Sequence, residues 1–392
     1  MIKQLLLFIF VFITYTGYSQ RDTILGPVKS VREQLLFTKA FRKKEKKRYK
    51  NVKYGPRFSR MRFYPEIFYR IPEARLPLYI DYWYGGVSVS YGSYYIEYNK
   101  QKKRTKETWY YGHNRIKADY RYTYDDNGNK TQHKEIYNDG SHRATNYHYN
   151  KKNKLLTTLL YSSDSPDFYW YKEYIYDDQE NLIEIKKSGP RGATGNSTIY
   201  EYDDQNRRIK IFSHSSYTTK YPEWVEKQPQ HIRIQLHLDG KMKELGRRVP
   251  KETTTLKTSY VWDDQNRKIE IQEHDEYKLN IKLKYKGDLL IQIKRTNKDS
   301  LVTFTDKEYN DDKRIIKSAR TNVKYPKDST SKRYFYNQKE RLSKIINNGK
   351  YKIDTVAFKY TYDQYNNWIE QTKSVNGEEL YVRKRKITYY TD

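Results

Sequence analysis

Aspartates recur along the chain at a regular interval and are its first candidates for chemistry. Five of them directly follow a pair of aromatic residues: Asp125, Asp177, Asp203, Asp263 and Asp363. Two carboxylates about 5 Å apart would suit a retaining glycosidase. Asp is also a favoured first residue of a turn, because its side chain accepts a hydrogen bond from the backbone two residues on. A repeat puts each acid in its own turn, so we expect turn formation and no catalytic pair.

Motifs of the familiar enzyme classes are missing from the sequence. It has no phosphate-cradling glycine loop, no Gly-x-Ser-x-Gly and no His-Glu-x-x-His. Cysteine is absent as well, which excludes disulfides, a Cys nucleophile, a Cys metal site and lipid attachment through an N-terminal Cys. The eight histidines are scattered; His231 and His237 are six apart, and we interpret all eight as isolated surface imidazoles. We therefore expect no enzyme activity, no cofactor and no metal.

The strongest candidate for binding is a basic segment near the N-terminus. From Arg42 to Arg62 the chain has eleven Lys or Arg and one acid, Glu45. Aromatic rings lie among these charges, so a bound polyanion would meet both cations and ring faces. The alternative is a solvated arm. The candidate polyanion-binding residues are Arg42, Lys43, Lys44, Lys46, Lys47, Arg48, Tyr49, Lys50, Tyr54 and Arg57.

The aromatic pairs themselves allow two interpretations. Exposed rings in a row would stack on sugars or bases, whereas rings on neighbouring strands would pack together and build a sheet. Repetition in every unit favours the structural role. The residues to which we assign it are Tyr122, Tyr124, Asp125, Gly128, Tyr174, Tyr176, Asp177, Tyr200, Tyr202, Asp203, Tyr260, Trp262, Asp263, Tyr360, Tyr362 and Asp363.

The spacing of these pairs defines the elements that carry them. The second aromatic of each pair lies at 98, 124, 149, 176 and 202, then at 262, 285, 309, 336 and 362, in steps of 23 to 27 residues on either side of one 60-residue gap. Tyr98, Tyr285 and Tyr309 are weaker copies without the first aromatic, and the gap holds an insertion with a degenerate copy near Leu238. Such a period is the signature of a repeat architecture.

Each unit has the composition of a β-hairpin. Residues at i and i+2 point to one face of a strand, and a turn cluster such as Asp125 to Asn129 follows. Within it, Asn127-Gly128 is a strong hairpin signal because both residues tolerate positive φ; Asn206, Asn266 and Asn367 replace the glycine elsewhere. Since a single hairpin is marginal in water, neighbouring units must pair edge to edge. The predicted fold is all-β, with tandem antiparallel β-hairpin repeats forming a curled, continuous sheet.

These repeats resemble the YD-repeat, or Rhs-like, family. The resemblance rests on Tyr-x-Tyr-Asp-x-x-(Gly/Asn)-x-(Leu/Ile) segments such as YTYDDNGNK (122–130) and YIYDDQENLIE (174–184), and it covers roughly residues 91 to 392. GPVKSVRE (26–33) also resembles the opening of exported members from Bacteroidetes-type bacteria. The family implies a long antiparallel sheet that spirals into an open or closed shell, which in larger members encloses a toxin domain after the repeats. Here the sequence ends at the last unit, so we expect no toxin domain and too few units to close a large shell.

The N-terminus indicates export. Lys3, the apolar run Leu5 to Ile13 and the polar stretch ending at Gln20 have the layout of a secretory signal peptide; an uncleaved anchor is the alternative. Cleavage near Gln20 would remove one of the 77 basic residues and no acid, lowering the net charge from +29 to +28. We expect a periplasmic, cell-surface or extracellular protein. Its net positive charge would attract polyanions. The alternative is that the charge is spread over solvated faces of the protein.

The expected organisation has three parts. Residues 1–20 are the signal peptide, 21–90 a basic and aromatic region capping the sheet, and 91–392 the repeats, with an irregular insertion at about 213–250. We expect a non-catalytic scaffold or binding module of the cell envelope. The alternatives are a protein that binds acidic polysaccharide or extracellular nucleic acid through the basic segment, and a glycan-processing enzyme. Partners would be a polyanion or an envelope protein, and the sequence leaves the oligomeric state open.

Overall fold

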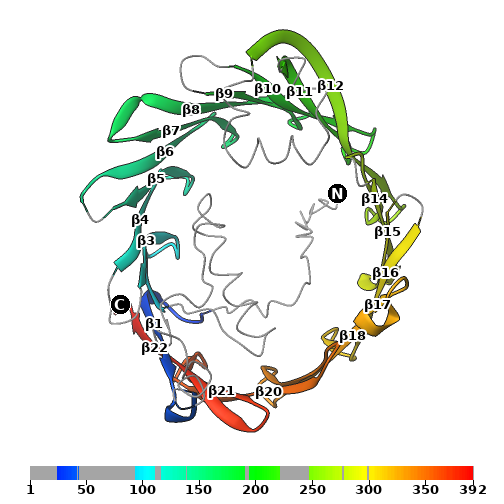
Figure 1. Cartoon of the computed structure of the whole chain (residues 1–392). Coiled ribbons are helices and arrows are strands. Elements are labelled where there is room, and N and C mark those ends of the chain that lie inside the picture. The colour runs from blue at the N-terminus through cyan, green and yellow to red at the C-terminus, as the bar shows by residue number, and fades with distance from the viewer. Residues whose placement is uncertain are drawn as a thin grey trace, which may run out of the picture.

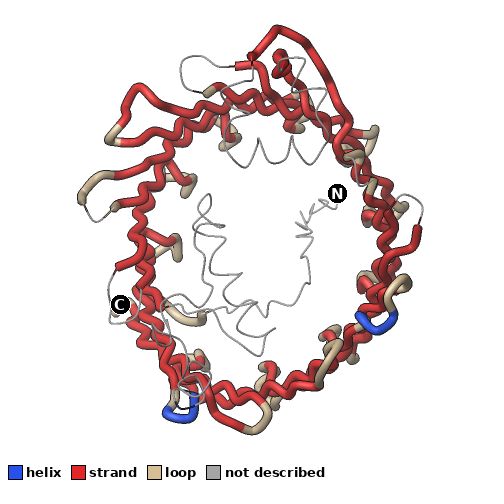
Figure 2. Tube along the Cα trace, viewed as in Figure 1, coloured by secondary structure: helices blue, strands red, loops and turns tan. Residues whose placement is uncertain are grey.

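A single antiparallel β-sheet closes on itself to form a barrel of 22 strands (Figure 1). The computed structural model describes residues 24–41, 43, 93–110, 116–137, 139–189, 194–220, 247–275, 278–297 and 300–391. Each strand pairs with its neighbours in the chain, and β1 pairs with both β2 and β22. Nearly all of the described chain is strand or short turn (Figure 2).

The strands are β1 Val28–Phe37, β2 Ser93–Tyr98, β3 Arg104–Tyr110, β4 Ile116–Tyr124, β5 Lys130–Ile136, β6 His142–Tyr149, β7 Leu155–Ser162, β8 Ser165–Tyr176, β9 Leu182–Ser188, β10 Thr194–Tyr202, β11 Arg208–Lys220, β12 Arg247–Trp262, β13 Lys268–Glu273, β14 Leu279–Lys286, β15 Leu289–Asn297, β16 Ser300–Tyr309, β17 Ile315–Asn322, β18 Thr330–Tyr336, β19 Leu342–Asn348, β20 Ile353–Tyr362, β21 Trp368–Val375 and β22 Glu378–Tyr389. A short 3-10 turn, η6 (Pro326–Asp328), joins β17 to β18.

The all-β antiparallel prediction is confirmed, but the sheet is a closed barrel and not the curled sheet that we predicted. Strands β2 to β22 number 21, so in an antiparallel meander the first and last run in the same direction. One further strand antiparallel to both can join them, and β1 does so. It pairs with β2 from Ser30 to Glu33 and with β22 along nearly its whole length. Every one of the 22 described strands therefore pairs on both sides, and pairing of this kind removes the aggregation hazard of an open edge.

The two faces of the sheet differ in character. Directly paired residues lie on one face, so the face that carries Val31 can be followed around the barrel through Tyr94, Tyr122 and Tyr200. We call it the core face. It holds the buried cluster, concentrated near β1, whereas the other face carries exposed ion pairs such as Lys210–Glu201. Side chains converge on the concave side of a closed single sheet, and we therefore assign the core face to the lumen.

Nine of the ten repeat turns share one backbone conformation, and the turn after Tyr285 is instead a two-residue loop, Gly287-Asp288, between the paired residues Lys286 and Leu289. In the turn after Tyr124, the Gly128 N–H donates to the Asp125 carbonyl and the Asp125 N–H to the Asn129 carbonyl, both at 2.9 Å, and only Gly128 has positive φ, at 77°. This is a type I turn followed by a left-handed residue. The prediction of positive φ holds for Gly128, Asn206 and Asn266, but Asn127 does not adopt it. In the last turn the left-handed residue is Asn366, one position before the predicted Asn367, because it is the fourth residue of the turn.

The segments expected to be irregular contain more strand than predicted. The N-terminal region contributes β1 to the sheet itself, between β2 and β22. At the insertion, β11 extends to Lys220 and β12 begins at Arg247, and the two form a long antiparallel pair. Residues 221–246, with the degenerate copy near Leu238, lie outside the described residues. Most of the basic segment does so as well.

Candidate functional site

The second aromatic of each repeat links its hairpin to the preceding one. The register between paired strands shifts at this residue in every unit, as at Tyr124 and Tyr176. Its hydroxyl then donates to a backbone carbonyl at the start of the second strand of the previous hairpin: Tyr124 to Arg104 at 2.7 Å and Tyr176 to Leu155 at 2.9 Å. The same bond is made by Tyr149, Tyr202, Tyr309 and Tyr336. These tyrosines therefore join one repeat to the next.

Two units make this link differently. Trp262 uses its indole N–H, which donates to the Arg208 carbonyl at 2.9 Å. In the last unit the first aromatic takes over: the Tyr360 hydroxyl donates to Leu342 at 2.6 Å, and Tyr362 accepts from the Asn337 amide. All the repeat aromatics that we predicted to be structural lie in the sheet, with Tyr122, Tyr174, Tyr200 and Tyr260 on its core face.

The repeated aspartates are bound within their own turns. The Asp203 carboxylate accepts from the Arg207 backbone at 2.9 Å and from the Arg207 guanidinium at 2.7 Å. Partial desolvation alone would raise the pKa of Asp203, but the hydrogen bonds from Arg207 and Gln205 outweigh it and lower the pKa. The pKa of Asp125 is also lowered, chiefly by the hydrogen bond from the Asn129 side chain. A general acid needs a raised pKa, so these carboxylates are poorly suited to that role.

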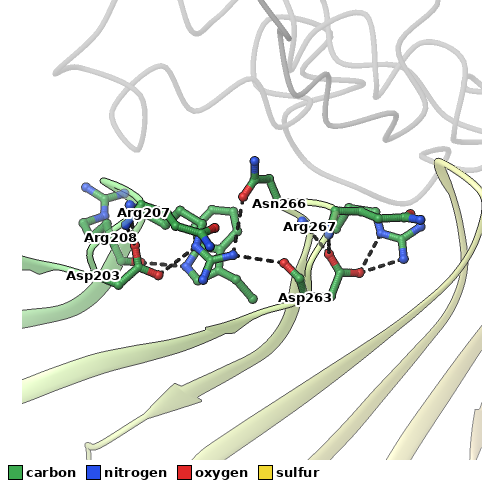
Figure 3. A network of polar contacts seen from close by, with 9 residues as sticks. Asp203, Arg207, Arg208, Asp263, Asn266 and Arg267 are labelled. Carbon is green, nitrogen blue, oxygen red and sulfur yellow. Dashed lines mark hydrogen bonds and ion pairs between the residues drawn. The ribbon is translucent and has the colours of Figure 1, made fainter.

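Neighbouring turns are also connected to one another. The residue after the left-handed position reaches the next turn: Arg207 donates to the Asp263 carbonyl at 3.0 Å and lies 3.4 Å from the Asn266 amide oxygen (Figure 3). Elsewhere an amide makes the corresponding contact, as from Asn129 to Asn153 at 2.8 Å. The polar and charged side chains of these turns therefore stabilise the rim of the barrel.

A buried charged cluster lies where the chain closes the barrel, and sequence analysis missed it. Glu33 on β1 has no exposed surface, and its carboxylate accepts from Arg383 at 2.6 Å, Arg385 at 2.9 Å and the Tyr94 hydroxyl at 2.6 Å. The Arg385 guanidinium also stacks on Trp368, 3.5 Å from the ring centroid. We call Glu33, Tyr94, Arg383 and Arg385 the seam cluster. Nothing local in the sequence indicates that these residues are in contact, because the contact depends on the pairing of β1 with β22.

A lysine with an unusual pKa lies beside the seam cluster. Lys373 on β21 is completely buried. Burial, together with the positive charge of Arg383, lowers the pKa of Lys373 to about 7. Gln371, two residues before it, is also buried and accepts from Arg383 at 3.4 Å. This part of the core face therefore holds several cationic groups away from water.

A second buried acid, Glu107, lies on β3. Glu107 accepts from the Trp109 indole at 2.5 Å and from the Tyr122 hydroxyl at 3.3 Å, and Arg104 lies 3.4 Å away. Together with the seam cluster it shows that the thickest part of the core combines aromatic rings with paired charges. Buried charges in proteins are normally paired and hydrogen-bonded in this way.

The remaining predicted site residues are only partly placed. Of the basic segment, the structure describes the side chain of Lys43 alone, which is exposed; Arg42 and Lys44 to Arg57 lie outside the described residues. So do His231 and His237. Among the described residues no three His, Asp or Glu side chains are arranged to hold a metal ion, and in the same part of the chain no helix is long and apolar enough to cross a membrane.

No family model matches the chain, and no curated protein matches it. Two solved structures of the toxin complex TcdB2-TccC3, one with Cdc42 and one without the hypervariable C-terminal region, have TM-scores of 0.31 and 0.32 at 9% identity. In both cases the likeness covers 75% of this chain but only 18% of the other. A porin-like protein from Bacteroides uniformis has a TM-score of 0.22 at 11% identity, over 76% of this chain and 90% of that one.

Proposed function

We infer that the protein is an exported, non-catalytic YD-repeat protein that acts as a structural or binding scaffold of the cell envelope. The observation that carries this proposal is the use of the repeated acids. Each is bound inside its own turn, and the pKa values of Asp125, Asp203, Asp263 and Asp363 are all lowered. Successive repeats are two strands apart, roughly 10 Å, which is wider than the 5 Å of a retaining carboxylate pair.

The tyrosines support the same conclusion. In the repeats where the second aromatic donates to the previous hairpin, the proton of its hydroxyl is used within the sheet. A closed sheet whose polar side chains stabilise the barrel is suited to hold a shape and to present surfaces. Export rests on the signal-peptide layout of residues 1–20.

A direct test separates a scaffold from a glycan-processing enzyme. The mature protein would be incubated with acidic and neutral polysaccharides, and the products analysed by mass spectrometry. We expect no change in polymer length with the wild type, and a lower melting temperature but no other effect with Asp203→Asn and Asp263→Asn. Release of shorter oligosaccharides by the wild type, lost in either variant, would refute the proposal.

A second candidate function is polyanion binding through the basic segment. The density of charge there, eleven cations and one acid in 21 residues, favours it. Replacing Lys43, Lys44, Lys46, Lys47 and Arg48 with Gln should remove most of the affinity for an acidic polysaccharide. If the segment is a site, replacing five lysines on the exposed face of the sheet, opposite the core face, should leave that affinity largely unchanged. Equal losses would indicate diffuse attraction by the whole net charge of the mature chain, +28 after one lysine is removed from +29.

A further inference from the structure

The three most exposed large hydrophobic side chains of the described residues lie in two neighbouring loops. They are Tyr351, Ile353 and Tyr325, which are 86%, 69% and 55% exposed, and Val323 in the same loop as Tyr325 is 44% exposed. Val323 and Tyr325 lie between β17 and β18; Tyr351 lies between β19 and β20, and Ile353 begins β20. We call these four residues the loop patch. The repeat turns join β16 to β17 and β18 to β19, so both loops lie at the opposite end of the barrel.

Polar contacts hold the two loops in a defined arrangement. The Asn322 side chain accepts from the Tyr325 N–H at 3.0 Å, and the Asn322 N–H donates to the Ser329 hydroxyl at 3.1 Å. The Lys350 ammonium of the second loop and the Asp328 carboxylate of the first are 2.5 Å apart. The exposed side chains therefore form one surface that is carried by two connected loops.

The same two loops are basic. Residues 323–329 and 349–353 include four lysines and one aspartate, so their net charge is +3. Asp354, directly after the second loop, is buried and pairs with one of these lysines at 3.0 Å. Lys324 and Lys327 are exposed and form no ion pair within the described chain. A partner of the loop patch should therefore carry negative charge beside an apolar phase.

We propose that the loop patch docks the barrel on an anionic membrane surface, with its rings and aliphatic side chains among the lipid headgroups and its lysines on their phosphates. Tyrosine is favoured at this depth because its ring is apolar and its hydroxyl polar, and basic residues beside a membrane are attracted to anionic lipids. A protein partner fits less well, because lysine is depleted from protein interfaces. A sugar fits less well, because ligand sites are concave. This inference rests on the proposed place in the cell envelope and names the surface that the protein would contact there.

The lack of cysteine permits a direct test in the full mature chain. Val323→Cys and Val261→Cys would each be coupled to a nitrobenzoxadiazole dye. The two valines are 44% and 46% exposed, and Val261 lies beside a repeat turn at the other end of the barrel. With vesicles of phosphatidylcholine containing about 30% phosphatidylglycerol, we expect the emission of the first dye to rise and shift to the blue, and the second to stay unchanged. The same response at both positions, or at neither, would overturn the proposal.

Vesicle sedimentation would measure the apolar contribution. Val323→Ser with Ile353→Ser should lower partitioning to these vesicles by about tenfold or more, since both side chains would leave water on docking. The control is Leu25→Ser with Val261→Ser, two side chains of similar size and exposure at the end that carries the repeat turns. We expect a loss of less than about twofold for the control. Circular dichroism would verify folding, and equal losses in the two pairs would overturn the proposal.

The cations have a matched control as well. Lys324→Gln with Lys327→Gln should cost roughly fivefold for each lysine, because each contributes on the order of 1 kcal/mol near an anionic surface. Lys284→Gln with Lys286→Gln removes two exposed charges from β14 and should cost less than about twofold. Equal losses would mean diffuse attraction by the net charge. Undiminished binding to vesicles of pure phosphatidylcholine would refute the anionic requirement.

Three further outcomes would assign the loop patch to another partner. Loss of vesicle binding only when the lysines of the basic segment are replaced would move the contact to that segment. A chondroitin sulfate hexasaccharide that binds the wild type but not Tyr351→Ser would make the ligand a sugar. A dimer in analytical ultracentrifugation that Tyr351→Ser dissociates would make the partner a second copy. Cleavage of a polysaccharide would refute the non-catalytic role and leave vesicle docking unaffected.

Discussion

Removing the acid of the seam cluster should destabilise the whole barrel. Glu33→Gln keeps the shape of the side chain but leaves Arg383 and Arg385, both buried, without their carboxylate. Breaking a buried ion pair by removing one partner costs about 3–5 kcal/mol. At about 2.1 cal/mol/K of unfolding entropy per residue, this corresponds to a melting temperature lower by roughly 5 °C for a chain of this length.

The control for this variant lies on the neighbouring strand pair. Glu370 on β21 pairs with Lys384 at 3.0 Å, but both side chains are substantially exposed, at 39% and 53%. Exposed pairs contribute about 1 kcal/mol at most, so Glu370→Gln should lower the melting temperature by about 1 °C. Scanning calorimetry would measure both variants at pH 7. If Glu33→Gln melts within a degree of Glu370→Gln, the seam cluster does not stabilise the barrel and the reasoning fails.

Three further predictions concern single residues. Tyr176→Phe removes the hydroxyl bond to Leu155 and should destabilise the protein by about 1 kcal/mol in urea unfolding, whereas Tyr174→Phe, whose hydroxyl makes no corresponding link, should have a smaller effect. Gly128→Val should cost about 1–2 kcal/mol more than Gly128→Asn because of the positive φ at this position; equal melting temperatures would mean that the turn conformation is wrong. The pKa of Lys373, about 7 in the folded chain and 10.5 unfolded, means that the unfolded state binds more protons between these values. The unfolding free energy should therefore rise from about pH 7 to 10.5, and a Lys373→Met variant that keeps this rise would contradict the burial argument.

The sequence was sufficient for the local structure of the repeats. The aromatic pairs, the Asp at each turn and the step of 23 to 27 residues predicted the hairpins because these features depend on residues close in the chain. Weak copies at Tyr98, Tyr285 and Tyr309 were placed correctly, each at the same register shift as the strong ones. The turn of the last unit was assigned one residue late, since Asn366 and Asn367 are chemically alike and only the backbone separates them.

Closure and the seam cluster escaped prediction because they depend on pairing between distant strands. The seam cluster needs the register of β1 with β2 and β22, and neither Arg383 nor Arg385 stands out in a chain with 77 basic residues. The segment from Val28 to Phe37 was separated from the repeats because it lacks their motif. Its alternation of apolar and polar residues is compatible with a strand, but no residue within the segment indicates which strands it pairs with.

The seam cluster accounts for how that distant strand finds its place. β1 must pair with β22 across a separation of about 350 residues, where no turn fixes the register. A slip by one residue would turn every side chain of β1 to the other face. Glu33 would then leave the core face, and Arg383 and Arg385 would stay buried without an acid. A slip by two would keep the face but move Glu33 away from Tyr94 and Arg385, the residues with which it pairs directly. The charged contacts therefore penalise the alternative registers more than an apolar seam would, because Val31, Leu35 and Ile96 could exchange neighbours at little loss.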